Sequence, residues 1–221
     1  MTHLVVDNTS AVPRATRLPM RMRQAEVVVD VDLDRRELRR REQCGSPPIL
    51  NLDLLNLLLE MPVSSPVTRG DLSDYGWRLL RAGERLYAVD LIQVDGLVRV
   101  VRRAVPPLAV RHVRVSACHW RAGFSVASRF APYGSRELVL DQLPASDIEL
   151  RLEATYLGIG IAVRSEDADV PARRLVEPAP FAPARYTGAS WLFAERLLAQ
   201  QPRPKLRAVL PESDPGLHHR R

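Results

Sequence analysis

The chain has 221 residues, of which 46% are hydrophobic and 26% are charged, so it can bury an apolar core and is not expected to be globally disordered. Its 32 basic residues exceed its 26 acidic residues, which gives a formal net charge of +6. Lys205 is the only lysine, which excludes a P-loop or Schiff-base centre in the first two hundred residues. Cys44 and Cys118 are too few for a disulfide framework or a four-thiolate zinc site.

The sequence also limits where the protein acts. No apolar run reaches the roughly 20 residues of a membrane span, and the first ten residues lack the pattern of a secretion signal. We therefore expect a cytoplasmic protein without a membrane partner. The positive charge favours either a solvated basic surface or a nucleic-acid footprint. Because arginine richness with almost no lysine is typical of a GC-rich bacterial genome, the arginine content alone does not decide between them.

The N-terminal part, residues 1–48, is predicted to be a flexible basic arm that is dispensable for folding. Val27 to Val31 could form a short strand. The stretch from Asp32 to Glu42 is mostly charged, with Leu33 and Leu38 as its only apolar residues. A helix in this stretch would have almost no face to bury, so we expect it to be solvated.

Residues 49–84 are predicted to form a small helical segment. Its first helix spans Asn51 to Met61 and places four leucines at helical spacing before Pro62 ends it: Leu54, Leu55, Leu58 and Leu59. A second helix follows a turn rich in serine, threonine and proline, with Trp77 and Leu80 facing inward. Two interpretations stay open, namely part of a winged helix-turn-helix and a helical cap on an α/β core.

Residues 85–199 are predicted to form an α/β core, and the polar, proline-rich residues 200–221 a disordered tail. A strand over 86–94, the turn Asp95-Gly96 and a return strand over 97–101 predict a β-hairpin. Alternating strands and helices follow at 108–115, 120–131, 138–140, 148–157 and 159–163, with a last helix over 190–198. The order predicts a mixed central sheet, a β-hairpin followed by β-α-β-α-β, with helices packed on it.

Several short motifs in this core resemble those of the PD-(D/E)XK nuclease superfamily. In that superfamily a strand with Glu-x-Lys leads into a Trp-Arg helix, and a strand of the form Arg, aliphatic residues, Asp follows. The corresponding segments here are Val113 to Ser116, Trp120-Arg121, Ser135 to Asp141 and the Gly158-Ile-Gly160 strand. The resemblance covers about residues 85–198 and implies a restriction-endonuclease-like core that acts on nucleic acid.

The resemblance also implies a metal centre, from which this sequence departs. The superfamily uses an acidic pair to hold Mg²⁺ and a lysine to activate water. Here Arg114 stands at the place of the glutamate and Ser116 at the place of the lysine. We therefore expect no cofactor and a catalytically degenerate core. The alternative is an active Mg²⁺-dependent nuclease in which Asp90 works with a migrated acid, either Asp95 or Glu137.

The leading hypothesis is a nucleic-acid-interacting protein that acts within a larger assembly. Its candidate contacts are arginines, which bind phosphate through a planar fork: Arg102, Arg103, Arg111, Arg114, Arg121, Arg129 and Arg136. Arg121, Ser125 and Arg129 would share one helix face, opposite Phe124 and Ala127. A further alternative is a scaffold protein that docks a protein partner through Leu54 to Leu59 or Leu192 to Leu198.

Overall fold

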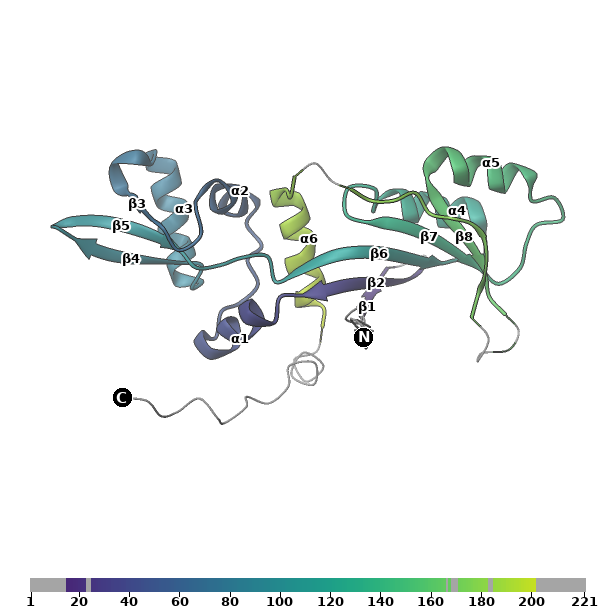
Figure 1. The fold of residues 1–221 in the computed structure, drawn as a ribbon, viewed down its shortest axis with the longest axis horizontal. Coiled ribbons are helices and arrows are strands. Elements are labelled where there is room, and N and C mark those ends of the chain that lie inside the picture. The colour runs from purple at the N-terminus through teal and green to yellow at the C-terminus, as the bar shows by residue number, and fades with distance from the viewer. Residues whose placement is uncertain (1–14, 23–24, 166, 168–170, 183–184, 202–221) are drawn as a thin grey trace, which may run out of the picture.

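The computed structural model describes residues 15–22, 25–165, 167, 171–182 and 185–201. Its strands form two β-sheets of unequal size, on which the helices pack (Figure 1). The larger, central sheet has six strands in the order β1-β2-β6-β7-β8-β9. These strands are β1 (Thr16–Arg21), β2 (Glu26–Leu33), β6 (Leu108–Ser116), β7 (Ser135–Leu140), β8 (Ile159–Val163) and β9 (Arg173–Val176). The smaller sheet has three strands, in the order β3-β5-β4.

The central sheet is mixed, as the sequence predicts. β6, β7 and β8 run parallel, while β1, β2 and β6 pair antiparallel at one side and β9 pairs antiparallel with β8 at the other. The parallel strands are connected by helices α4 (Trp120–Ser128) and α5 (Ile148–Leu157), which lie on the same side of the sheet in Figure 1. These crossovers are the β-α-β-α-β unit expected from the alternation of strand and helix patterns.

The two faces of the central sheet differ in polarity. On the face that carries the helices, Val27, Val115, Leu138 and Ile161 lie in register and are almost fully buried. Helix α4 approaches β7 so closely that a Cβ at Gly123 would overlap the side chain of Leu138. The opposite face carries charged and polar side chains, which is the usual division for a sheet with one solvated face.

The smaller sheet belongs to a compact module with its own core. Its elements are α2 (Leu52–Glu60), β3 (Pro66–Thr68), the short 3₁₀ helix η1 (Arg69–Asp71), α3 (Asp74–Arg85), β4 (Val89–Val94) and β5 (Leu97–Arg102). Asn51 and Ser73 cap α2 and α3 by accepting hydrogen bonds from backbone N–H groups. The β4–β5 turn places Asp95 and Gly96 at φ of 53° and 74°, as a two-residue hairpin requires.

The hairpin was expected to begin the central sheet, and this prediction is wrong. β4 and β5 pair with each other and with β3, and none of them pairs with a strand of the central sheet. The inner face of the hairpin, which includes Val89 and Val100, packs against α2 and α3. Residues 103–107 then lead to β6, so the antiparallel part of the central sheet is supplied by β1 and β2 instead.

The predicted flexible arm is also wrong for the described residues 15–22 and 25–48. β2 is an internal strand between β1 and β6, with Val27, Val29 and Val31 almost fully buried. The stretch read as solvated forms α1 (Arg35–Cys44), capped by the Asp34 side chain. The hydrophobic pattern does not predict that this helix is buried, because its inward face carries Glu37 and Arg41 along with Leu38. The two charged side chains form a buried ion pair with each other. Residues 1–14 and the predicted tail, 202–221, lie outside the described residues.

Helix α6 (Gly188–Ala199) connects the two cores. Trp191 is fully buried in the core of the module, whereas Phe193 and Leu197 belong to the core of the central sheet. Leu54, Leu55 and Leu58 of α2 are likewise buried, so the two leucine-rich segments offered as docking surfaces serve mainly as packing surfaces. In the described part of the chain, no helix is both long and apolar enough to cross a membrane.

Candidate nucleic-acid interface

The polar face of the central sheet carries a network of ion pairs across its strands. Arg114 on β6 donates from Nη2 to both carboxylate oxygens of Asp30 on β2, at 2.9 and 2.6 Å. Glu137 on β7 accepts from Nε of Arg174 on β9 at 2.8 Å. This network includes Arg114, one of the predicted nucleic-acid contacts, and its guanidinium is already paired with a carboxylate.

Glu137 is nearly buried, with a side chain 5% exposed. Burial by itself raises the pKa of a carboxyl group, but the contacts with His112 and Arg174 outweigh burial and hold the pKa of Glu137 below its usual range. The carboxylate is therefore ionised and held in place by two basic side chains. It lies in the central sheet, whereas Asp90 and Asp95 belong to the β4–β5 hairpin, so the structure does not pair Glu137 with either acid.

A serine, a histidine and an acid meet on this polar face. His112 Nδ1 lies 2.7 Å from Ser135 Oγ, and His112 Nε2 lies 3.5 Å from a carboxylate oxygen of Glu137. Ser135 Oγ also donates its proton to the backbone carbonyl of Arg111 at 3.1 Å. Ser135 Oγ therefore lies between the Arg111 carbonyl oxygen, which only accepts, and His112 Nδ1, whose role as donor or acceptor follows from the tautomer of the ring. The arrangement ties strands β6 and β7 together.

Asp90 has an ordinary partner. Its carboxylate is about half exposed and accepts from Nε of Arg103, which directly follows β5, at 2.6 Å. Asp95 lies at the tip of the same hairpin, where it approaches Arg99 at 3.9 Å. Among the residues that the structure describes, no three histidine, cysteine, aspartate or glutamate side chains are grouped so that they could hold a metal ion.

The seven predicted arginines do not form one surface. Arg102 is buried: it donates to the carbonyls of Met61 and Ala104 and lies over the Trp191 ring at 5.2 Å. Arg136 is half buried and donates to the carbonyl of Leu157 at 2.7 Å. Burial lowers the pKa of both guanidiniums, which remain charged because the ordinary arginine pKa is so high. These two arginines hold the fold together.

Four of the other five pair with carboxylates. Arg103 pairs with Asp90, Arg111 with Asp32, Arg114 with Asp30 and Arg121 with Glu149. Arg121 also lies over the Trp120 ring at 4.2 Å. Arg129 is exposed and forms no ion pair with any described residue. The predicted helix face is present, since Arg121, Ser125 and Arg129 are exposed and Phe124 and Ala127 are buried, but only Arg129 on it is a free cation.

A second basic helix face lies in the small module and was missed by sequence reasoning. Arg78, Arg81 and Arg85 on α3 are exposed, at positions i, i+3 and i+7. Arg81 lies 3.3 Å from Glu84 on the surface, while neither Arg78 nor Arg85 forms an ion pair with a described residue. The signal was present in the sequence: Leu80 at the centre of the buried face places these arginines opposite it.

Neighbouring acids are partly occupied by other contacts. Asp74, in the first turn of α3, pairs with Arg69 at 2.7 Å, and the Tyr75 hydroxyl donates to Asp53 at 2.6 Å.

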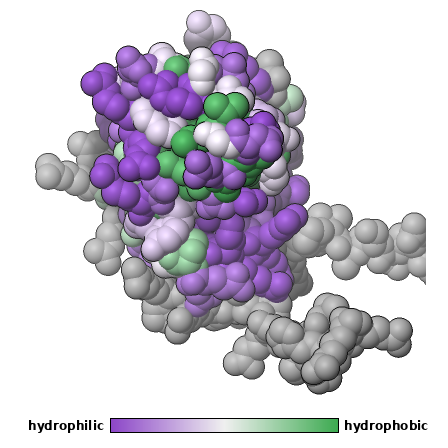
Figure 2. Space-filling view, turned by 90° about the vertical axis from the view of Figure 1, so that its left-hand side faces the viewer, coloured by the Kyte–Doolittle hydropathy of each residue, from purple (hydrophilic) through white to green (hydrophobic). Residues whose placement is uncertain are grey.

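Figure 2 views the molecule from the end that carries this module and shows mostly hydrophilic side chains around an apolar patch. The exposed apolar side chains of the hairpin are Leu97 and Val98, 57% and 41% exposed.

Comparison of the chain with protein-family models, with curated proteins and with solved structures gave no match.

Proposed function

We propose that the protein binds nucleic acid, and that the module of residues 49–102 presents α3 to the phosphate backbone. We propose that the central sheet is a nuclease-like platform that is catalytically degenerate. The observation that carries the proposal is the exposed face of α3, with Arg78, Arg81 and Arg85 on a helix that is held by a small sheet.

The element order of the module supports this proposal. Helix α2, strand β3, the turn η1, helix α3 and the β4–β5 hairpin follow one another, and β5 lies between β3 and β4. This order is similar to that of a winged helix-turn-helix, in which the second helix of the motif enters the major groove. A short 3₁₀ turn takes the place of the first helix of the motif. The hairpin would then lie beside the duplex as the wing.

The charge on α3 supports binding that does not depend on sequence. Arginine guanidiniums contact phosphate oxygens bidentately and release counterions from the nucleic acid. The exposed face of α3 carries arginines at its centre. It has few of the amide or carboxylate side chains that read base edges. We therefore expect binding that is governed by salt concentration more than by base sequence.

The test is fluorescence anisotropy with a labelled duplex, repeated over a range of salt concentrations. The triple variant Arg78→Gln, Arg81→Gln and Arg85→Gln should weaken binding and flatten the salt dependence by at most about 2.7 units, since each lost phosphate contact removes about 0.9. The matched control is Arg121→Gln with Arg129→Gln, a pair of exposed arginines on α4. We expect a smaller effect from the control. Absence of binding at low salt, or an unchanged slope in the triple variant, would contradict the proposal.

The proposal includes no metal-dependent cleavage. Asp90 is held by Arg103, and Glu137 is held by Arg174 in the other sheet, so neither is placed to share a metal ion with the other. We expect that supercoiled plasmid stays intact when it is incubated with the protein and Mg²⁺ or Mn²⁺. Nicking that disappears in Asp90→Asn would favour the active-nuclease alternative instead.

A further inference from the structure

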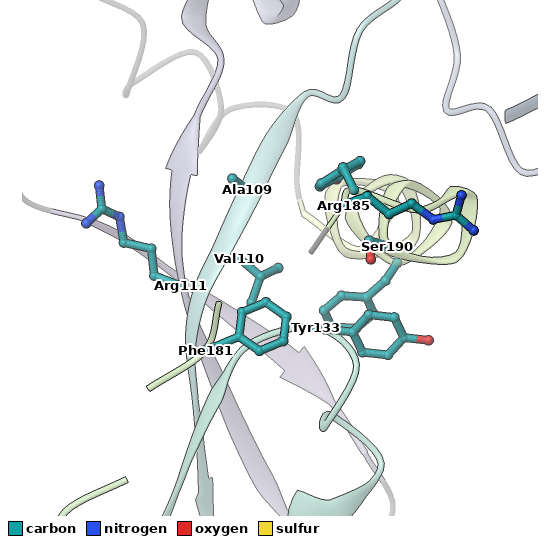
Figure 3. Close-up of a pocket in the computed structure, with 9 residues that line it drawn as sticks. Ala109, Val110, Arg111, Tyr133, Phe181, Arg185 and Ser190 are labelled. Atoms are coloured by element: carbon teal, nitrogen blue, oxygen red, sulfur yellow. The ribbon is translucent and has the colours of Figure 1, made fainter. Parts of the chain in front are cut away.

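A cavity of about 390 Å³ lies between strand β6, the turn before β7, and the segment that leads into α6 (Figure 3). Its volume falls in the range of small-molecule sites, which hold about 300–1,000 Å³. Neither the α3 face nor the ion-pair network of the central sheet contributes a residue to its lining, apart from Arg111. The cavity is therefore separate from the proposed duplex-binding surface.

Aromatic rings dominate the lining. Tyr133 stacks on Phe193, with ring centroids 4.4 Å apart and an angle of 15° between the planes. Phe181 lies on the other side of the opening, in front of Val110 (Figure 3). Phe193 is almost fully buried and fixes the plane of Tyr133, whereas Phe181 and Tyr133 stay partly exposed. The rings of Phe181 and Tyr133 thus form partly exposed apolar walls of the cavity.

The polar groups of the lining favour a negative charge. Arg185 lies at the α6 side of the cavity, and its exposed guanidinium extends outward across α6 at the mouth of the cavity, where it forms no ion pair with a described residue (Figure 3). Ser190 lies in the first turn of α6, where its backbone N–H and its hydroxyl both already hydrogen-bond with the Thr187 hydroxyl, so the anionic preference depends on Arg185. Arg111 contributes its stem, because its guanidinium points away and pairs with Asp32. No carboxylate is present among the lining residues.

The hydroxyl of Tyr186 is used within the protein. It donates to the carbonyl of Leu108 at 3.4 Å, and burial raises the pKa of this phenol. Tyr186 therefore remains neutral and adds no negative charge to the cavity. The cavity has flat apolar walls, one unpaired guanidinium and no acid among its described lining residues. These features favour a planar aromatic ligand that carries an anionic group.

We propose that this cavity binds a nucleoside monophosphate unit, with the base against the rings of Phe181 and Tyr133 and the phosphate on Arg185. Aromatic side chains take up unstacked bases of any sequence, and the arginine fork matches phosphate oxygens. A free nucleotide and the phosphorylated end of a strand both present this pair of groups, a base and a phosphate. Binding here does not require the α3 face to bind a duplex.

The test is calorimetric titration of the full chain with adenosine monophosphate, adenosine, inorganic phosphate, and a trinucleotide with or without a 5′-phosphate. We expect the monophosphate to bind about tenfold or more tightly than adenosine, because one charge-assisted contact is lost with the phosphate. Inorganic phosphate alone should give no measurable heat. If the 5′-phosphorylated trinucleotide binds more tightly than the monophosphate, a strand end is the source; the reverse order indicates a free nucleotide. Absence of binding by both would overturn the proposal.

Variants separate the two parts of the site. Arg185→Gln should reduce monophosphate affinity to that of adenosine, whereas Phe181→Ala should weaken both ligands. Arg196→Gln, an exposed arginine on α6 away from the cavity lining, is the control and should change neither. If Phe181→Ala lowers the melting temperature, Phe181→Leu keeps an apolar side chain there and still removes the ring. Monophosphate binding that survives both Arg185→Gln and the Phe181 variant would show that the ligand lies elsewhere. The α3 triple variant should bind the monophosphate normally, so failure of one proposal does not imply failure of the other.

Discussion

At the scale of single residues, a buried ion pair determines how the two cores meet. Arg41 of α1 donates through Nη1 and Nη2 to the two carboxylate oxygens of Glu195 on α6, at 2.7 Å each. Glu195 also accepts from Trp191 Nε1 at 2.8 Å and from the backbone N–H of Ile49 at 3.1 Å. Burial alone would lower the pKa of Arg41, but the bonds to Glu195 and Glu37 raise it above the usual value. Every polar atom of this junction therefore has a partner.

Removing one member of this pair should be costly. Arg41→Met leaves Glu195 fully buried without its counter-charge, and we expect a loss of about 3–5 kcal/mol in the free energy of unfolding. Urea denaturation measures this loss. The control is Arg39→Met, an exposed position on the same helix, which should change stability by less than about 0.5 kcal/mol. A similar result for both variants would show that the buried pair contributes nothing.

Glu137 makes stability depend on pH. Its pKa in the folded state lies below its usual value of about 4.3 in the unfolded chain, so its contribution is present in full above that value. The contribution is lost as pH falls from there through the lower, folded-state pKa. We expect Glu137→Gln to be less stable than wild type at pH 7, and the difference to shrink at pH 3. Denaturation at both values measures it, with the exposed Glu60→Gln as the control. A difference that is independent of pH would contradict the assignment.

At the scale of elements, α5 shows that an amphipathic pattern does not by itself decide which face is buried. The sequence places Ile148, Leu152 and Tyr156 on one face, and they are 68%, 67% and 88% exposed. Leu150 and Ala154 on the other face pack against the central sheet. Ser146 to Glu149 has the sequence form of a capping box, but Asp147 is the N-cap residue and its side chain makes no capping hydrogen bond. Both faces of this helix are partly apolar, so periodicity could not select between them.

Two leucines of α5 test this orientation directly. Leu150→Ala should cost about 2–5 kcal/mol in the free energy of unfolding, because it leaves a cavity under the helix. Leu152→Ala, two residues away on the exposed face, should cost less than about 0.5 kcal/mol. Thermal or chemical denaturation distinguishes them. The reverse order of effects would mean that the helix is rotated relative to this structure.

At the scale of the whole molecule, segments far apart in the sequence complete each other. β2, from the N-terminal fifth of the chain, pairs with β6 along its full length, and α6, near the other end, contacts both α2 and β6. Glu195 receives hydrogen bonds from α1, from α6 itself and from Ile49. The central sheet therefore depends on the N-terminal residues and cannot be treated as a domain that begins at residue 85.

A truncation measures this dependence. A chain that begins at Pro47 lacks β1, β2 and α1, which exposes the edge of β6 and removes the partner of Glu195. We expect this chain to lose its cooperative thermal transition or to aggregate, because an uncovered edge strand and an unpaired buried charge remain. A chain that begins at Ala15 keeps every described element and should melt as the full chain does. A truncated chain from Pro47 that melts within a few degrees of the full chain would contradict the structure.

The sequence by itself determined the local structure of most of the chain. Leucine spacing and Asn51 predicted α2, Asp95-Gly96 predicted the hairpin, and the alternation after Leu108 predicted the strands and helices around β6, β7 and β8. These signals are local, because hydrophobic periodicity, caps and turn residues act within a few positions. The mixed α/β class follows from their order.

Tertiary structure alone decided which partners these elements have. The hairpin joined a sheet of its own, and a charged stretch became a buried helix because Glu195, 154 positions away from Arg41, neutralises it. The candidate sites changed for the same reason, since six of the seven predicted arginines already have partners. The exposed arginines of α3, by contrast, lie opposite the predicted inward residue Leu80 and could have been found from the sequence. Charge satisfaction and strand pairing are long-range properties, and no local pattern records them.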